Sequence, residues 1–421
     1  MDLNILLLGL IILIGFVGHI LFKYTKIPES LFMILIGLAV GPVFGIVDQA
    51  LFTDYQSLIV TITLVIVLLD SGLKLNLFDT MKSMVKALSF TLLVLIFSTF
   101  IVGTFFILIG WDPLSALLIG VVSSGTTTII TASLLPRLKI SEDIKQILIM
   151  ESIINDVTLI TAAVILVQVI DVGFIDLGQL FSLFFGPIAI AVVLGLVFTL
   201  LWVGVLWKFY QRVELAYVFT MGVLFILYSL VEIFGGNGAI AVLVLTLTLG
   251  NLPLILETFL GEESPLKLDF LKRYSLDLKT LQRFDDILDG IKESQVDFAF
   301  FVQNFFFVYL GVIFNPAKID FLLIGVCITI ILLMFVSRYV SARIMAFSDP
   351  QFKKHSKIVA SLVARGFTAT FIALLPETKG IKVPLFKEIV LIMVLLSTVV
   401  TILGSILYER RLKTPEENDS N

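Results

Sequence analysis

The chain contains about thirteen apolar stretches that are each roughly 20 residues long, and this repeated feature limits the fold more than any motif does. The stretches are continuous, whereas the strands of a membrane β-barrel are short and alternate apolar with polar residues. The sequence therefore predicts an all-α polytopic membrane protein whose surroundings are a lipid bilayer. The candidate spans lie near residues 3–23, 27–46, 56–75, 84–110, 114–136, 144–170, 177–207, 213–234, 237–256, 296–315, 319–345, 356–376 and 384–408.

The composition excludes several other classes of protein. Of the 421 residues, 58% are hydrophobic and 15% are charged, whereas soluble proteins average about half apolar and a quarter charged. The net charge of −4 and the lack of a basic patch give no reason to expect a nucleic-acid partner. Neither histidine shares metal-ligand spacing with cysteine or carboxylates, and no phosphate-binding loop is present. We therefore expect no cofactor and no enzymatic activity.

Lysine and arginine predict the orientation of the spans, because connections that stay in the cytoplasm carry the excess of positive charge. Alternate connections hold most of these residues, from Lys23 and Lys26 to Arg410 and Arg411. The opposite connections keep only Lys318, Lys379, Lys382 and Lys387. We expect an odd number of spans, with the N-terminus outside and the C-terminus in the cytoplasm, in a multi-pass protein of the cytoplasmic membrane.

The same pattern predicts the domain organisation. Residues 1–410 are expected to form a single transmembrane domain, and residues 411–421 a solvated cytoplasmic tail. Within residues 257–295, apolar residues recur at helical spacing between charged ones. This pattern predicts an amphipathic cytoplasmic connection between two halves of the domain. A simple linker is as compatible with this segment as a regulatory element.

An ionisable side chain at membrane depth raises the free energy of the folded protein unless it is paired or hydrated. Each such residue is therefore expected to have a functional or structural role. The richest segment contains Glu151, Ser152, Asn155 and Asp156. Helical geometry places Ser152 and Asp156 on one face. A carboxylate flanked by hydroxyl and amide oxygens is a plausible hard-cation site, and the same carboxylate can bind a proton. The alternative is that Asp156 is a buried hydrogen-bonding residue.

Two spans are interrupted by small and hydroxyl residues, at 123–128 and at 363–370. One such interruption in each half is typical of a transporter built from inverted repeats, with its site at the midplane, although small residues also mediate ordinary helix packing. Arg365, in the second interruption, needs a partner, and Glu151 is the expected one. Arg338 lies one turn from Arg343, and we expect it to extend toward the cytoplasm. Asp70 is expected either to reach the cavity that contains Asp156 or to mark the end of its span at the membrane surface.

The segment Glu151-Ser152-Ile153-Ile154-Asn155-Asp156 resembles the Glu-Ser-x-x-Asn-Asp motif of monovalent cation:proton antiporters, in particular the electroneutral NhaP-type Na⁺/H⁺ branch. The similarity extends to the stretches at 68–75, 123–128, 235–242 and 364–369. It implies a fold of thirteen helices in two inverted repeats, with two crossed broken helices. It also implies a homodimer, with a dimerisation bundle and a mobile core bundle in each subunit.

The resemblance also implies roles for individual residues. Asp156 would bind the ion and the proton, Ser152 would add a ligand oxygen, and Asn155 would shape the site. Asp70 and Thr126 would lie close to the Na⁺ ion, and Glu151 with Arg365 would form a structural ion pair. Thr127 departs from the family pattern Thr-Asp-Pro, because Thr126-Thr127-Thr128 lacks both the acid and the proline. A neutral threonine can still offer an oxygen atom to a cation.

The resulting expectation is a secondary transporter that exchanges Na⁺ or Li⁺ for H⁺, one for one, through competition for Asp156. Because Thr127 replaces an acid, a K⁺/H⁺ antiporter or a K⁺ efflux system of the same fold is the main alternative. A cation channel or a non-transporting sensor is a more distant one. An intramembrane protease using Asp70 and Asp156 would need a water-handling motif that the sequence does not supply.

Overall fold

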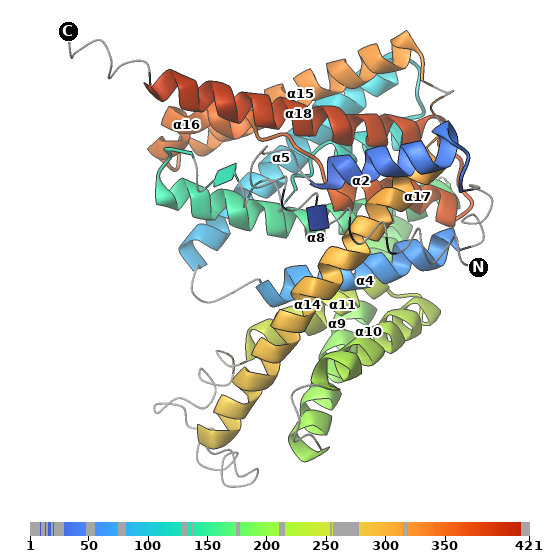
Figure 1. Ribbon diagram of the computed structural model, residues 1–421, viewed down its shortest axis with the longest axis vertical. Helices are drawn as coiled ribbons and strands as arrows, with labels where there is room; N and C mark the ends of the chain where they lie inside the picture. Colours follow the sequence, from blue (N-terminus) through green and yellow to red (C-terminus); the bar gives the residue numbers. More distant parts are fainter. Residues whose placement is uncertain are drawn as a thin grey trace. The chain divides into compact units, whose positions relative to one another are not determined.

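All regular elements in the described part of the computed structural model are helices (Figure 1). The structure describes residues 29–47, 55–74, 81–127, 131, 134–135, 138–173, 177–209, 215–252, 255, 278–314, 316 and 319–413, together with residues 9, 13, 16, 17 and 20. The helices are α2 (Glu29–Leu38), η1 (Ala39–Val43), α4 (Gln56–Lys74), α5 (Met81–Leu108), α6 (Pro113–Val122), α8 (Glu142–Val172), α9 (Leu177–Phe209), α10 (Ala216–Ile233), α11 (Gly238–Gly250), α14 (Leu278–Ile313), α15 (Phe321–Met345), α16 (Pro350–Ser361), α17 (Phe367–Thr378) and α18 (Phe386–Lys413).

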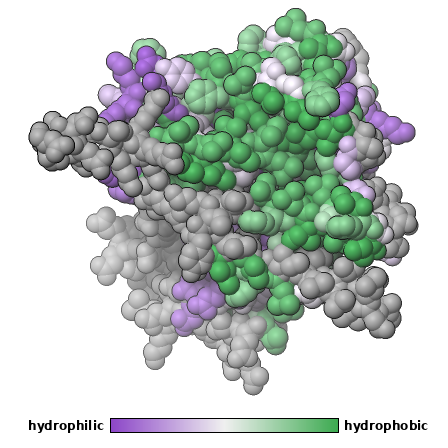
Figure 2. All heavy atoms as spheres, turned by 45° about the horizontal axis from the view of Figure 1, so that its top comes forward, coloured by the Kyte–Doolittle hydropathy of each residue, from purple (hydrophilic) through white to green (hydrophobic). Residues whose placement is uncertain are grey.

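Eight of the described helices are long and apolar enough to cross a membrane. Three shorter apolar helices, at Leu31–Val43, Pro113–Val122 and Gly238–Gly250, accompany them. Apolar side chains also cover much of the molecular face shown in Figure 2, which suits a surface in contact with lipid. The prediction of an all-α polytopic membrane protein is therefore confirmed. The first predicted span, 3–23, lies almost entirely outside the described residues.

The contacts divide the chain into two compact units. The single transmembrane domain that the sequence predicted stays a prediction. Unit 1 contains Met1–Val60, Lys82–Ile175 and Gln303–Asn421, and unit 2 contains Thr61–Met81 and Asp176–Val302. In unit 1, α8 packs against α6 and α17, and α15 packs against α16 and α18. In unit 2, α9, α10 and α11 pack against one another.

Unit 1 contains both of the interrupted spans that the sequence predicted. The first interruption follows α6, which ends at Val122 and is followed by the non-helical residues 123–127. The second separates α16 from α17 by the non-helical residues 362–366. The prediction that helices break at these two places is confirmed.

The two non-helical stretches contact each other directly, and we call this place the crossing. The backbone N–H of Thr127 donates a hydrogen bond to the carbonyl of Ala364 at 3.0 Å. A side chain at Gly366 would overlap the side chain of Thr127, so glycine permits the close approach.

The helix α18 supplies partners for backbone groups that the second break frees. Thr401 Oγ1 accepts a hydrogen bond from the N–H of Val363 at 3.0 Å, and Ser397 Oγ accepts one from the N–H of Arg365 at 3.1 Å. Non-helical backbone at membrane depth needs such partners, because lipid supplies none. The hydroxyl residues of α18 therefore stabilise the break.

Two predicted boundaries lie inside helices of the structure. The sequence placed a connection at 257–295 before a span at 296, but α14 runs without interruption from Leu278 to Ile313. Residues 256–277 lie outside the described residues. The tail was expected to begin at residue 411, but α18 continues to Lys413, and residues 414–421 also lie outside the described part. Helical hydrogen bonding continues past the end of an apolar run, which hydropathy does not detect.

The start of α16 is tied to α5 by an ion pair that the sequence did not predict. Asp349 Oδ2 lies 2.7 Å from Lys86 Nζ, and Asp349 Oδ1 accepts a hydrogen bond from the N–H of Gln351 at 3.1 Å. The hydrogen bond from Lys86 is the largest cause that holds the pKa of Asp349 below its usual value. This carboxylate therefore stabilises the folded state at pH values above the pKa that it has in the unfolded chain. The stabilisation is lost as the pH falls through the lowered pKa of the folded state.

We expect Asp349→Ala to reduce the stability of the detergent-solubilised protein at pH 7 by about 1 kcal/mol, since the helix loses its N-cap and part-exposed ion pairs add little. The deficit should shrink as the pH falls below about 4, where the unfolded carboxylate becomes protonated. Thermal unfolding between pH 3.5 and pH 7.5 measures this. Asp171→Ala, at an exposed position on α8, is the control and should change nothing. A deficit for Asp349→Ala that is equal at every pH would contradict the role of the charged pair.

Candidate functional site

The helix α8 brings the predicted site residues to the crossing of the two breaks. It packs against α6 and against α17, whose ends border the crossing. Glu151, Ser152 and Asn155 are buried, with exposed fractions of 1%, 0% and 2%. Asp156, one residue further along, is partly exposed. The four residues thus differ in access to solvent although they occupy little more than one turn of helix.

Asp156 contacts the second broken helix. Its Oδ1 accepts a hydrogen bond from Thr368 Oγ1 at 2.6 Å. Thr368 is buried, and it is the second residue of α17, which begins directly after the non-helical stretch. A carboxylate that binds a hydroxyl at the end of a broken helix occupies the kind of position where transporters hold ions.

Asn155 fixes the first non-helical stretch against α8. Its Nδ2 donates to the carbonyl of Ser124 at 3.3 Å and to Thr126 Oγ1 at 3.2 Å. The Thr126 hydroxyl in turn donates to Glu151 Oε1 at 3.1 Å. Asn155 therefore holds this stretch next to Asp156. The role at the ion site that the resemblance implied for Asn155 stays a prediction.

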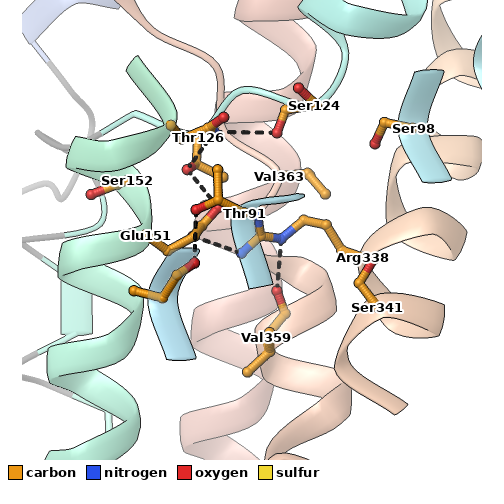
Figure 3. A network of polar contacts seen from close by, with 12 residues as sticks. Thr91, Ser98, Ser124, Thr126, Glu151, Ser152, Arg338, Ser341, Val359 and Val363 are labelled. Carbon is orange, nitrogen blue, oxygen red and sulfur yellow. Dashed lines mark hydrogen bonds and ion pairs between the residues drawn. The ribbon is translucent and has the colours of Figure 1, made fainter. Parts of the chain in front are cut away.

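Glu151 forms a buried ion pair with Arg338 of α15, as Figure 3 shows. Arg338 Nη1 lies 3.0 Å from Glu151 Oε1, and Nη2 lies 3.3 Å from Oε2. Arg338 Nε donates to the carbonyl of Val359 at 3.1 Å, and the guanidinium carbon lies 5.3 Å from the ring centroid of Phe90. The carboxylate, the carbonyl and the ring together surround the charge of Arg338.

This geometry corrects two expectations from the sequence. Glu151 was expected to pair with Arg365, but its ion pair is with Arg338. Arg338 was expected to extend toward the cytoplasm, but it has an exposed fraction of 0%. The physical reason is that α15 packs against α16 and α18, so this face of the helix is enclosed. Sequence spacing from Arg343 does not reveal which face of α15 is covered.

Arg365 lies inside the crossing and contacts backbone. Its Nη2 donates to the carbonyl of Ser123, the residue that caps the C-terminus of α6. A positive group is favourable at a helix C-terminus, because the last carbonyls point outward unpaired. Within the described residues, Arg365 Nε and Nη1 have no hydrogen-bond partner.

Three of the predicted cation ligands make other contacts in this structure. Ser152 Oγ donates to the carbonyl of Ile149 at 2.8 Å. Thr126 Oγ1 bridges Asn155 and Glu151, as described above. Thr127 is buried, and its backbone N–H bonds Ala364. Their assignment as ion ligands stays a prediction.

Asp70 lies in unit 2, near the end of α4. Its Oδ2 lies 2.7 Å from Lys74 Nζ, one turn further along the same helix. Asp70 and Lys74 line a cavity of about 290 Å³ together with Lys292 and Gln295. The predicted participation of Asp70 in the ion site also stays a prediction.

The family described as "Sodium/hydrogen exchanger, transmembrane" matches residues 9–407 of the chain. The chain belongs to the sodium/hydrogen exchanger family. This membership confirms the resemblance that the Glu-Ser-x-x-Asn-Asp segment indicated, and it places the protein among transporters rather than enzymes. No curated protein matches the exchanger in sequence.

Solved structures show that the fold of this exchanger is shared. The sodium proton antiporter MjNhaP1 from Methanocaldococcus jannaschii at pH 8 is 19% identical, with a TM-score of 0.71 over 97% of each chain. An electron-microscopy map of the same antiporter gives 18% identity and a TM-score of 0.66, over 97% of this chain and 95% of that one. At this level of identity the likeness concerns the fold.

The sequence interpretation of the exchanger missed the roles of two residues. Thr368 was noted only as a hydroxyl in the second interruption, and its position two residues after Gly366 was the available signal. Arg338 lies more than one turn inside the end of the predicted span at 319–345, and a charge at that depth indicates a buried partner.

Proposed function

We propose that this exchanger moves Na⁺ or Li⁺ in one direction and H⁺ in the other, one for one, across the cytoplasmic membrane. The observation that carries the proposal is the contrast between two neighbouring carboxylates of α8. Glu151 is fully buried in an ion pair with Arg338, whereas Asp156 is partly exposed and contacts the broken helix α17. Asp156 is therefore the accessible acid at the crossing.

Competition between the cation and the proton for Asp156 is sufficient to couple their transport. A bound cation displaces the proton, and a bound proton displaces the cation, since each neutralises the same carboxylate. Unit 1 carries the loaded carboxylate between the two sides by alternating access. Because one positive charge replaces another, the complete cycle moves no net charge.

Two further observations support this proposal. The fold is shared with a protein named as a sodium proton antiporter. The two breaks in unit 1 contact each other beside Asp156, which is the arrangement that ion-coupled transporters use at the midplane.

A pH-gradient assay in proteoliposomes tests the proposal. We expect Na⁺ and Li⁺ to dissipate an imposed pH gradient, with K⁺ and Ca²⁺ much less effective. The rate should be the same with the membrane voltage clamped at zero and at about 100 mV, where each net charge moved would contribute about 2.3 kcal/mol. A voltage-dependent rate would contradict the one-for-one stoichiometry. Exchange driven by K⁺ alone would support the K⁺/H⁺ alternative instead.

We also propose that the exchanger works as a homodimer, as the resemblance implies. Light scattering of the purified protein, corrected for detergent, should give twice the mass of one chain. A mass of one chain at every concentration tested would contradict this proposal.

A further inference from the structure

A hydroxyl of the second broken helix contacts the accessible carboxylate. Thr368 Oγ1 lies 2.6 Å from Asp156 Oδ1. The hydroxyls that the sequence assigned to the cation, those of Ser152 and Thr126, bond Ile149 and the Asn155–Glu151 pair instead. Thr368 therefore has the best position among these hydroxyls to join Asp156 in holding a cation.

The hydroxyl of Thr368 bonds a side chain of another helix. Threonine hydroxyls in helices often bond the carbonyl four residues earlier, which for Thr368 is that of Ala364. That carbonyl already accepts a hydrogen bond from the N–H of Thr127. Thr370, two residues further along α17, makes the local bond instead, to the carbonyl of Phe367 at 2.6 Å. The same residue type thus serves two different roles on one helix.

The position of Thr368 is also held firmly by packing. The ring of Phe367, its neighbour, lies 4.9 Å from the ring of Phe306 on α14, measured between centroids. Gly366, two residues before Thr368, sits against Thr127 with no room for a side chain. These contacts hold the start of α17, and such rigidity is what a binding site needs.

Hydroxyl chemistry suits both forms of the neighbouring carboxylate. Threonine has one O–H donor and two lone pairs. In this structure it donates to Asp156. When a cation takes the place of that hydrogen bond, the hydroxyl can rotate and offer a lone pair, because hard cations prefer oxygen ligands. Valine has the same shape without either capacity.

We propose that Thr368 is a ligand of the transported cation and determines how tightly Na⁺ and Li⁺ bind beside Asp156. This inference rests on the function proposed above, and it names a ligand that the sequence pattern did not assign. It also places one ligand on each of the two elements that meet at the crossing, α8 and α17. Cation binding then joins these two elements.

The test compares Thr368→Val with Thr370→Val, the same change on the same helix. We expect Thr368→Val to raise the half-saturating Na⁺ and Li⁺ concentrations for exchange about tenfold, since one ligand to a charged ion is lost, and to keep more than half of the maximal rate. Thr368→Ser should restore the concentrations of the original protein. Thr370→Val should leave them unchanged, because its hydroxyl bonds only the helix backbone.

Thermal unfolding in detergent gives a second measurement that does not require transport. Na⁺ should raise the unfolding temperature of the original protein and of Thr370→Val, because a ligand that binds only the folded state stabilises it. Thr368→Val should need about ten times more Na⁺ for the same rise. If Thr368→Val does not fold, Thr368→Ala replaces it with the same expectation.

Half-saturating concentrations for Thr368→Val within twofold of the original values would overturn the inference. The same holds if Thr370→Val and Thr368→Val change them equally, because the effect would then be one of packing. Failure of the proposed function looks different: exchange would then persist without a carboxylate at position 156, whatever residue stands at 368.

Discussion

Asp156→Asn is expected to reduce Na⁺/H⁺ exchange in proteoliposomes to the rate of protein-free vesicles. Asparagine keeps the size of the side chain and one carbonyl oxygen, but it neither carries a negative charge nor binds a proton at neutral pH. Asp156 is the partly exposed carboxylate at the crossing, where Thr368 contacts it. Removal of its charge therefore removes the group for which both ions compete.

The matched control is Asp171→Asn, which removes a carboxylate from an exposed position on the same helix. It should exchange at the original rate. Asp156→Asn should also fold normally and keep its unfolding temperature, while losing the rise that Na⁺ produces in the original protein. Exchange by Asp156→Asn at the rate of the control variant would exclude Asp156 as the exchange site.

The second large effect is expected at the buried ion pair. Arg338→Met should lower the free energy of unfolding by about 3–5 kcal/mol, because Glu151 would keep a buried charge without its bidentate partner. Arg338 and Glu151 are each about 1% exposed as side chains, so water cannot replace the lost interaction. Thermal or chemical unfolding in detergent measures the loss.

Three companion variants separate this effect from others. Arg343→Met, at an exposed position on the same helix, should change stability little. The double variant Glu151→Leu with Arg338→Met should recover part of the loss, since no unpaired charge remains. Arg365→Met should cost less than Arg338→Met, because two nitrogens of Arg365 lack hydrogen-bond partners among the described residues. A larger loss for Arg365→Met would mean that Arg365 is the more important partner of Glu151.

Local sequence patterns predicted a large part of the fold and of the site. Apolar stretches of the length of a bilayer predicted the spans, because lipid requires the backbone to satisfy its own hydrogen bonds. Hydroxyl and glycine residues at 123–128 and 363–370 predicted the interruptions that the structure shows at 123–127 and 362–366. The spacing of Asn155 and Asp156 on one helix indicated the acid that the structure places at the crossing.

Contacts between distant elements could not be predicted in the same way. The choice of Arg338 rather than Arg365 as the partner of Glu151 depends on which face of α15 is enclosed. The contact of Thr368 with Asp156 joins residues 212 positions apart in the sequence. Hydropathy and spacing describe neighbours along one helix, and they contain no information about which helix lies opposite.

The sequence by itself thus determined the class of the protein, a bundle of membrane helices with two interruptions and few charges at depth, since these features follow from local hydrogen bonding and desolvation. The tertiary structure decided how those charges are used. It neutralises Glu151 by enclosing it with Arg338, and it leaves Asp156 accessible beside Thr368. Such a division depends on packing, because burial, and not residue type, sets whether a carboxylate is available to an ion.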